Sequence, residues 1–165
     1  MTHSRSLKSA ALVAVTVAAT LLLIQACGGG AVAQSTDADA VEGAWEAVIT
    51  VRDCSTGVTI LTAKGQQVLH RGGTLTDTNA SPPTTRGVGF GIWRRDGAGA
   101  SYTARFRFNR YKPDGTLAGT QRVTRVFTLS ADGNTQTSTN TSQTLDVAGT
   151  VLQNGCAGDV STRVP

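Results

Sequence analysis

Several residue types that carry common chemistries are scarce in this chain. Histidine occurs only at His3 and His70, so neither a Ser-His-Asp arrangement nor a histidine-rich metal site is indicated. The chain also lacks a CxxC pair, a Walker loop and a dinucleotide fingerprint. Its aspartates fall mainly in turn-like segments, where they are expected for backbone geometry. The sequence therefore predicts a non-enzymatic protein with no metal and no cofactor.

Lysine is scarce as well, and the chain is only weakly basic. Its formal net charge is +4, of which Arg5 and Lys8 near the N-terminus contribute two. Arginine dominates the remaining positive charge, with Lys64 and Lys112 as the other lysines. Nucleic-acid-binding domains usually carry a strongly basic stripe. The weak charge therefore predicts that nucleic acid is not a partner.

Long apolar segments are limited to one run near the N-terminus. Residues 10–24 contain no charge and follow the positive Arg5 and Lys8. A helix that spans a membrane needs about 20 such residues, and this run is shorter. A short apolar run behind positive residues is typical of an export signal. We expect residues 1–33 to be that signal and the protein to be periplasmic, in the cell envelope or secreted.

The end of this signal can be interpreted in two ways. Ile24-Gln25-Ala26-Cys27 resembles the lipobox of bacterial lipoproteins, which implies lipidation of Cys27 and makes that anchor the only expected membrane contact. Alternatively, Ala31-Val32-Ala33 is an A-x-A cleavage site that would release a soluble protein. Either way, we expect residues 34–42 to be a linker and residues 43–165 to form one domain.

The chain has three cysteines, an odd number that needs explanation in an exported protein. Cys27 is either lipidated or removed with the signal, which leaves Cys54 and Cys156. In an oxidising compartment these two are expected to form one disulfide that ties the end of the first strand to the last strand. Two free buried thiols are the alternative.

Alternating segments separated by turn residues fill the chain from Gly43 onward. Every second residue from Trp45 to Val51 is apolar or small, which predicts a strand with one apolar face. Helical periodicity of useful length is absent. We expect strands at residues 43–52, 58–70, 74–78, 86–95, 101–111, 121–129, 135–145 and 150–164. About eight short-linked strands predict an all-β domain, either an up-and-down barrel or a sandwich.

Two motifs at the ends of this domain favour the barrel. Gly43-Ala44-Trp45 in the first strand resembles the Gly-x-Trp signature of lipocalins, and Arg163 stands where that family keeps an arginine. The resemblance implies a calycin-like, single antiparallel up-and-down barrel of about eight strands. It implies that Arg163 packs over Trp45 and closes one end. It also implies a disulfide from the C-terminal segment to the barrel, which Cys54 and Cys156 would supply.

The chain is also similar to a group of uncharacterised exported bacterial proteins. Their shared pattern stands here as Arg52-Asp53-Cys54, Gly72-Gly73-Thr74-Leu75, Gly91-Ile92-Trp93, Asp114-Gly115-Thr116 and Ala131-Asp132-Gly133.

A barrel of this kind is expected to hold a small hydrophobic or amphipathic ligand, bound by burial of an apolar tail. Glycines at positions 87, 89 and 91 would share one face of their strand, where they either open cavity volume or permit barrel curvature. The expected cavity walls are Phe90, Tyr102, Phe106, Phe108 and Phe127.

Arg125 is the expected contact for a ligand head group, because it interrupts the apolar face that contains Val123 and Phe127. If that face points inward, the buried charge needs a partner, which Asp53, Glu46 or an anionic ligand could provide. If a bulge shifts the register, Arg125 is merely exposed.

A second interpretation makes the domain a fully packed barrel, because side chains alone can fill eight strands. Such a module would bind an envelope protein or inhibit a protease. Residues 79–83 and 135–145 would then be its contact surfaces.

Overall fold

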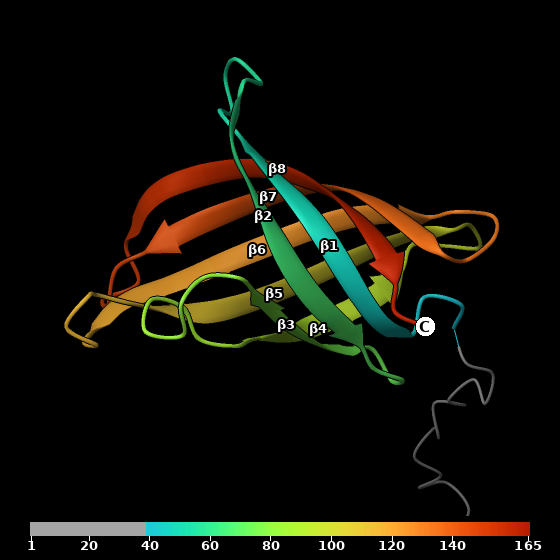
Figure 1. Ribbon diagram of the computed structural model, residues 1–165, viewed down its shortest axis with the longest axis horizontal. Coiled ribbons are helices and arrows are strands. Elements are labelled where there is room, and N and C mark those ends of the chain that lie inside the picture. The colour runs from blue at the N-terminus through green and yellow to red at the C-terminus, as the bar shows by residue number, and fades with distance from the viewer. Residues whose placement is uncertain (1–38) are drawn as a thin grey trace, which may run out of the picture. The chain divides into compact units, whose positions relative to one another are not determined.

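A computed structural model describes residues 39–165 as one closed barrel of eight strands (Figure 1). Each strand pairs antiparallel with the next along the chain, and the last strand closes on the first. The strands are β1 (Gly43–Arg52), β2 (Thr59–Leu69), β3 (Thr74–Asn79), β4 (Gly89–Arg95), β5 (Ser101–Tyr111), β6 (Leu117–Leu129), β7 (Thr135–Leu145) and β8 (Val151–Arg163). The expected all-β, up-and-down barrel is confirmed.

The N-terminal expectations lie mostly outside the described residues. These are the export signal at residues 1–33, the lipidation of Cys27 and the part of the linker that precedes Asp39. Within residues 39–165, no helix is long and apolar enough to cross a membrane.

Two strands begin more than one residue away from their expected starts, and all other strand bounds agree to within one residue. β6 begins earlier, at Leu117, because Gly119 with φ +135° accommodates an irregular start that non-alternating residues concealed. β4 begins later, at Gly89, because Arg86 forms only an isolated bridge with Arg110. The loop before β4 is therefore longer than expected and carries Arg86 beside the barrel wall.

Apolar side chains fill one end of the barrel. The ring of Tyr102 stacks on Phe127 with centroids 5.2 Å apart and meets Trp93 edge-on at 6.1 Å. The whole cluster consists of Val41, Trp45, Leu69, Leu75, Trp93, Tyr102, Ala104 and Phe127. Full burial of a large apolar side chain contributes roughly 1.5–3 kcal/mol. This cluster is the hydrophobic core of the barrel.

Trp45 and Arg163 close this same end, as the lipocalin resemblance implied. The guanidinium carbon of Arg163 lies 4.3 Å from the Trp45 ring centroid. Its Nε and Nη1 donate hydrogen bonds to the carbonyl oxygens of Gly133 and Glu42, at 3.0 and 2.8 Å. Gly43 has φ +128°, and a Cβ there would lie 2.9 Å from Arg163 Nη1. The guanidinium thus occupies space that only glycine leaves open.

The residues just before β1 belong to the barrel and not to a linker. Val41 is fully buried in the core, and its carbonyl accepts a 3.0 Å hydrogen bond from Trp45 Nε1. Asp39 accepts hydrogen bonds from Arg95 Nε at 3.1 Å and from the Tyr102 hydroxyl at 2.7 Å. The small, non-periodic composition of this stretch concealed its packing, so the expected boundary at residue 42 moves to before Asp39.

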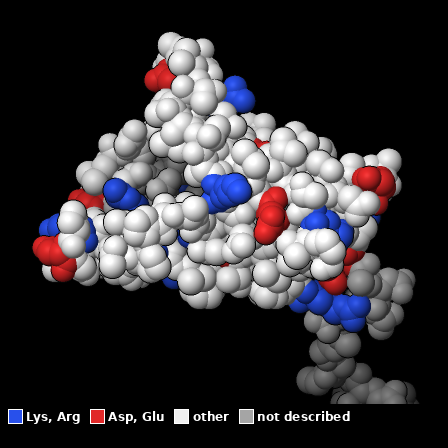
Figure 2. Space-filling view, in the orientation of Figure 1, with Lys and Arg blue, Asp and Glu red and all other residues white. Residues whose placement is uncertain are grey.

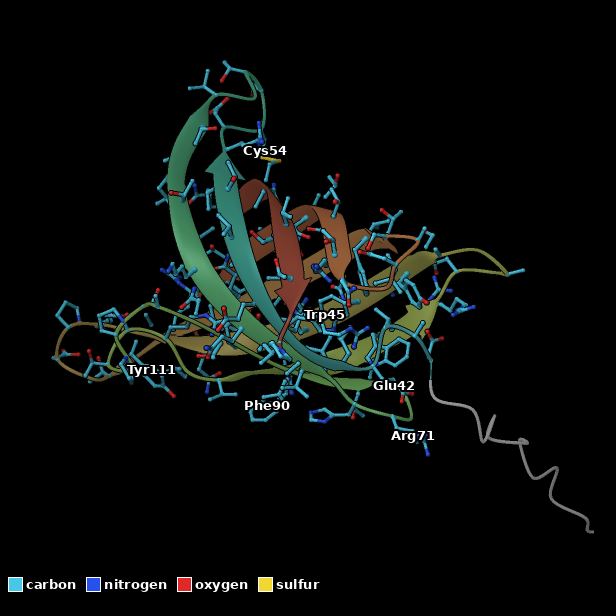
Figure 3. The ribbon with its side chains drawn as sticks, turned by 45° about the vertical axis from the view of Figure 1, so that its right-hand side comes forward. Glu42, Trp45, Cys54, Arg71, Phe90 and Tyr111 are labelled. Atoms are coloured by element: carbon cyan, nitrogen blue, oxygen red, sulfur yellow. A yellow bond between two sulfur atoms is a disulfide. The ribbon has the colours of Figure 1, made fainter. Side chains whose placement is uncertain are left out.

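A disulfide joins β1 to β8 at the opposite end of their shared seam (Figure 3). Cys54 follows β1 and Cys156 lies in β8 opposite Arg52, with 5.2 Å between the two Cα atoms. The two cysteines are 102 residues apart in sequence. The expected disulfide is confirmed, and the alternative of two free thiols is wrong.

β4 turns Gly89, Gly91 and Trp93 inward, and Phe90 and Ile92 outward. A Cβ on Gly91 would lie 2.1 Å from the carbonyl oxygen of Arg105 in β5. Gly91 does not border the cavity described below. Gly91 therefore permits the close approach of β4 and β5. Of the two roles expected for these glycines, this favours barrel curvature over cavity volume.

Candidate functional site

The barrel is hollow at the end away from Trp45. A cavity of about 370 Å³ lies there between residues of all strands except β4. Ligand sites commonly measure roughly 300–1,000 Å³, so this volume suits a small molecule. The molecular surface is hollowed beside the projecting β1–β2 hairpin (Figure 2). Side chains therefore do not fill this half of the barrel.

Apolar side chains form much of the cavity wall at the end farther from Trp45. They are Ile49 and Val51 of β1, Phe106 and Phe108 of β5, and Val123 of β6. Each of them is only half-buried. This wall thus retains apolar surface that a ligand tail would cover.

The expected aromatic walls separate into three groups. Phe106 and Phe108 line the cavity. Tyr102 and Phe127 lie in the hydrophobic core instead, with at most 1% of their surface exposed. Phe90 is 64% exposed and points away from the barrel (Figure 3). The assignment of Phe90 to the cavity wall is corrected, because alternation along β4 places it opposite the inward glycines.

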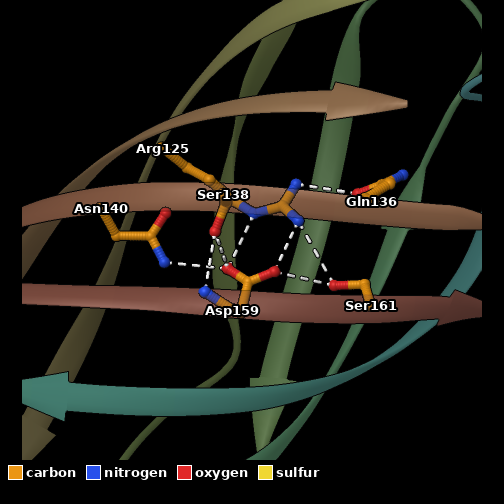
Figure 4. Close-up of polar contacts among 6 residues, drawn as sticks. All are labelled: Arg125, Gln136, Ser138, Asn140, Asp159 and Ser161. Carbon is orange, nitrogen blue, oxygen red and sulfur yellow. Dashed lines mark hydrogen bonds and ion pairs between the residues drawn. The ribbon is translucent and has the colours of Figure 1, made fainter. Parts of the chain in front are cut away.

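Arg125 lies at the base of the cavity in a buried polar network (Figure 4). Its Nε and Nη2 donate to the two carboxylate oxygens of Asp159 at 3.0 and 2.7 Å. Nη1 donates to Gln136 Oε1 at 2.9 Å, and Nη2 also reaches Ser161 Oγ at 3.3 Å. Its guanidinium carbon is 4.2 Å from the Phe127 ring centroid. Each nitrogen of this cation therefore has a hydrogen-bond partner in the protein, and one face of the guanidinium packs on an aromatic ring.

Asp159 is equally well satisfied. Its carboxylate also accepts hydrogen bonds from Asn140 Nδ2 and Ser161 Oγ, both at 2.8 Å, and from the Ser138 hydroxyl. Burial acts to raise the pKa of Asp159. The hydrogen bonds and charge of Arg125, with smaller contributions from Ser138 and Asn140, outweigh burial and lower that pKa to about 2. The carboxylate is therefore ionised at neutral pH.

The structure settles where Arg125 points and corrects its expected partner. The side chain is 3% exposed and faces inward, so no bulge turns it to solvent. Asp53 instead accepts hydrogen bonds from Ser55 and Thr56 in the β1–β2 turn. Glu46 is exposed on the outer face of β1. Asp159 is the partner, and its charge already balances that of Arg125.

A second buried ion pair contributes to the cavity wall. Arg86, in the loop before β4, donates from Nη2 to Asp77 Oδ1 of β3. The Arg86 guanidinium carbon lies 3.8 Å from the ring centroid of Phe108. Burial raises the pKa of Asp77 to about 6, although the charge and hydrogen bond of Arg86 oppose this rise. This pair is therefore held less firmly in its ionised form than the Arg125–Asp159 pair.

Two polar atoms of this cavity lining have no hydrogen-bond partner. They are Nε of Arg86, a donor, and Oδ1 of Asn140, an acceptor. Both are buried, and an unsatisfied buried polar atom costs roughly 1–3 kcal/mol. One hydrogen-bond donor and one acceptor of the lining thus remain unused.

Sequence reasoning missed Asp159, Asp77, Arg86 and Asn140. In β8 the apolar Val160 is 51% exposed whereas Asp159 is buried, so residue polarity does not indicate which face of this strand points inward. Asp77 lies in a short threonine-rich strand in which Leu75 is the one apolar residue, so no apolar pattern marks its inward face. No local pattern pairs either carboxylate with an arginine far away in the sequence.

Within residues 39–165, no group of three or more histidine, cysteine, aspartate or glutamate side chains could hold a metal ion. The fold and the hollow end together define a closed eight-stranded β-barrel with an interior cavity. Compared with known proteins, the chain matches no family model, no curated protein and no solved structure.

Proposed function

We propose that this protein is an exported, non-enzymatic, lipocalin-like barrel that binds one small amphipathic molecule in its cavity. The observation that carries this proposal is a half-empty barrel with an apolar upper wall above a buried polar base. Covering the apolar wall with a ligand tail would stabilise the complex by roughly 25 cal/mol per Å². The disulfide and the N-terminal export pattern support an oxidising compartment, such as the periplasm.

A cavity-filling substitution tests this proposal. Ala157 of β8 lines the cavity, whereas Leu152 of the same strand is 62% exposed outside it. We expect Ala157→Phe to weaken binding of a fluorescent amphiphile by about tenfold or more, since a well-packed aromatic leaves little free volume. Leu152→Phe, the matched control, should bind like the wild type. Equal probe binding by the two variants, with no ligand seen in native mass spectra, would overturn the proposal.

A second candidate function is binding to another protein of the envelope, including inhibition of a protease. The β1–β2 hairpin projects beyond the barrel (Figure 1). It exposes 64% of Val58 and 62% of Ile60, and β2 pairs with β3 only from Gly65 onward. Unpaired strand edges are common sites of strand addition. The inhibitor version predicts protease inhibition that Ile60→Asp abolishes, and a lack of inhibition across a protease panel removes it.

A further inference from the structure

Two arginines and two aspartates meet at the cavity, yet they leave it without net charge. Arg125 is 3% exposed and Asp159 4% exposed, and they form a two-point ion pair. Arg86 is 8% exposed and Asp77 10% exposed, and they form the second pair. Gln67, which also lines the cavity, is a further neutral neighbour. A buried charge that enters this site would therefore find every countercharge already engaged.

We propose that the ligand end bound at the base of the cavity is uncharged and hydrogen-bonding, as a hydroxyl or amide is. This inference rests on the proposed function and names its ligand class. A carboxylate would lose hydration without gaining a free cation, and a buried ion without a partner costs several kcal/mol. An ammonium group would meet carboxylates that already accept hydrogen bonds from Arg125, Ser161 and Arg86.

The unused polar atoms point to the same class of head group. Asn140 Oδ1 lacks a donor and Arg86 Nε lacks an acceptor. A hydroxyl or amide can donate and accept at once, whereas a carboxylate only accepts and an ammonium only donates. Because both atoms are buried, small side-chain movements would be needed to bring such a group within reach of either one. The apolar tail would then lie along Phe106 and Phe108 toward the mouth.

The test compares three amphiphiles with one tail: decanol, decanoate and decylamine. At about pH 8 the carboxyl group is ionised and the amine is protonated. Titration calorimetry with the purified full-length protein should show decanol binding at least about tenfold tighter than either ion, a difference of about 1.4 kcal/mol. Equal or tighter binding of decanoate or decylamine would overturn the inference that the ligand end is uncharged, but not the proposed function. Binding of none of the three would overturn the proposed function itself.

A charge-switch variant makes the test sharper. Asp77→Asn keeps the shape of the side chain and leaves Arg86 uncompensated, so decanoate should gain at least about tenfold in affinity relative to decanol. Glu46→Gln removes the same charge from the outer face of β1 and is the matched control, with no change expected. A similar gain in both variants would show that overall charge governs binding and would contradict the inference. The wild-type comparison stands even if Asp77→Asn folds poorly.

Discussion

At the scale of single residues, the Arg125–Asp159 pair governs the stability of the hollow half of the barrel. Asp159→Asn leaves Arg125 buried without a countercharge, and loss of one member of such a pair costs roughly 3–5 kcal/mol. We expect this loss in urea unfolding. Arg105→Met, on the exposed outer face, should change stability by no more than about 0.5 kcal/mol.

A double substitution distinguishes the effect of the ion pair on stability from the effect of side-chain packing. Replacing both members, as Arg125→Met with Asp159→Leu, removes the uncompensated charge, so the double variant should be more stable than Asp159→Asn. If the double variant lost more free energy of unfolding than Arg125→Met and Asp159→Leu lose together as single variants, this view of the network would be refuted.

Asp77 gives stability an unusual pH dependence. Burial, opposed by Arg86, raises its pKa from 3.8 to about 6, so the folded protein holds this proton more tightly than the unfolded chain. The free energy of unfolding should therefore fall as pH rises from about 4 to about 6, by an amount on the order of 3 kcal/mol. Urea midpoints across this range measure the effect.

Asp77→Asn should remove most of this decline, whereas Glu46→Gln should keep it. Asp159 acts with the opposite sign, because its pKa is lowered to about 2: its contribution is present above about pH 4 and is lost as pH falls toward 2. A wild-type stability that rises from pH 4 to pH 6 would contradict the role given to Asp77.

At the scale of elements, β4 depends on glycine to lie against β5. Gly91→Ala would place a Cβ 2.1 Å from the Arg105 carbonyl oxygen, so the two strands must separate. We expect a loss of about 2 kcal/mol or more in the free energy of unfolding, comparable with overpacking a core. Gly99→Ala in the following turn has no atom within 4 Å of its added Cβ and serves as the control. Equal midpoints for both variants would argue against close strand approach.

Sequence reasoning predicts elements far better than it predicts the site. Inward and outward alternation along a strand is a local property, so the segments around Trp45 and Tyr102 were placed with nearly the right bounds. The pairing of Arg125 with Asp159 instead depends on the registers of β6, β7 and β8 together. The sequence around a carboxylate in β8 does not indicate which arginine forms an ion pair with it.

At the scale of the whole molecule, the disulfide holds the closing seam between β1 and β8. The two cysteines are 102 residues apart, and a crosslink over such a distance stabilises a fold by at most roughly 4–5 kcal/mol. Cys54→Ser with Cys156→Ser should lower the urea midpoint while circular dichroism retains the strand signal. Ser55→Ala, beside Cys54 in the exposed turn, should leave the midpoint unchanged. An unaltered midpoint in the double variant would mean that hydrogen bonds and the Arg163–Trp45 contact suffice.

The pairing of β1 with β8 also sets the timing of biogenesis. The edge of β1 that pairs with β8 stays open until residues 151–163 have been made and have folded against it. Because open strand edges promote aggregation, the nascent chain passes through a vulnerable interval that ends only when nearly all of it is present. Folding of this protein therefore requires that the open edge of β1 be kept from pairing with other chains until β8 is in place.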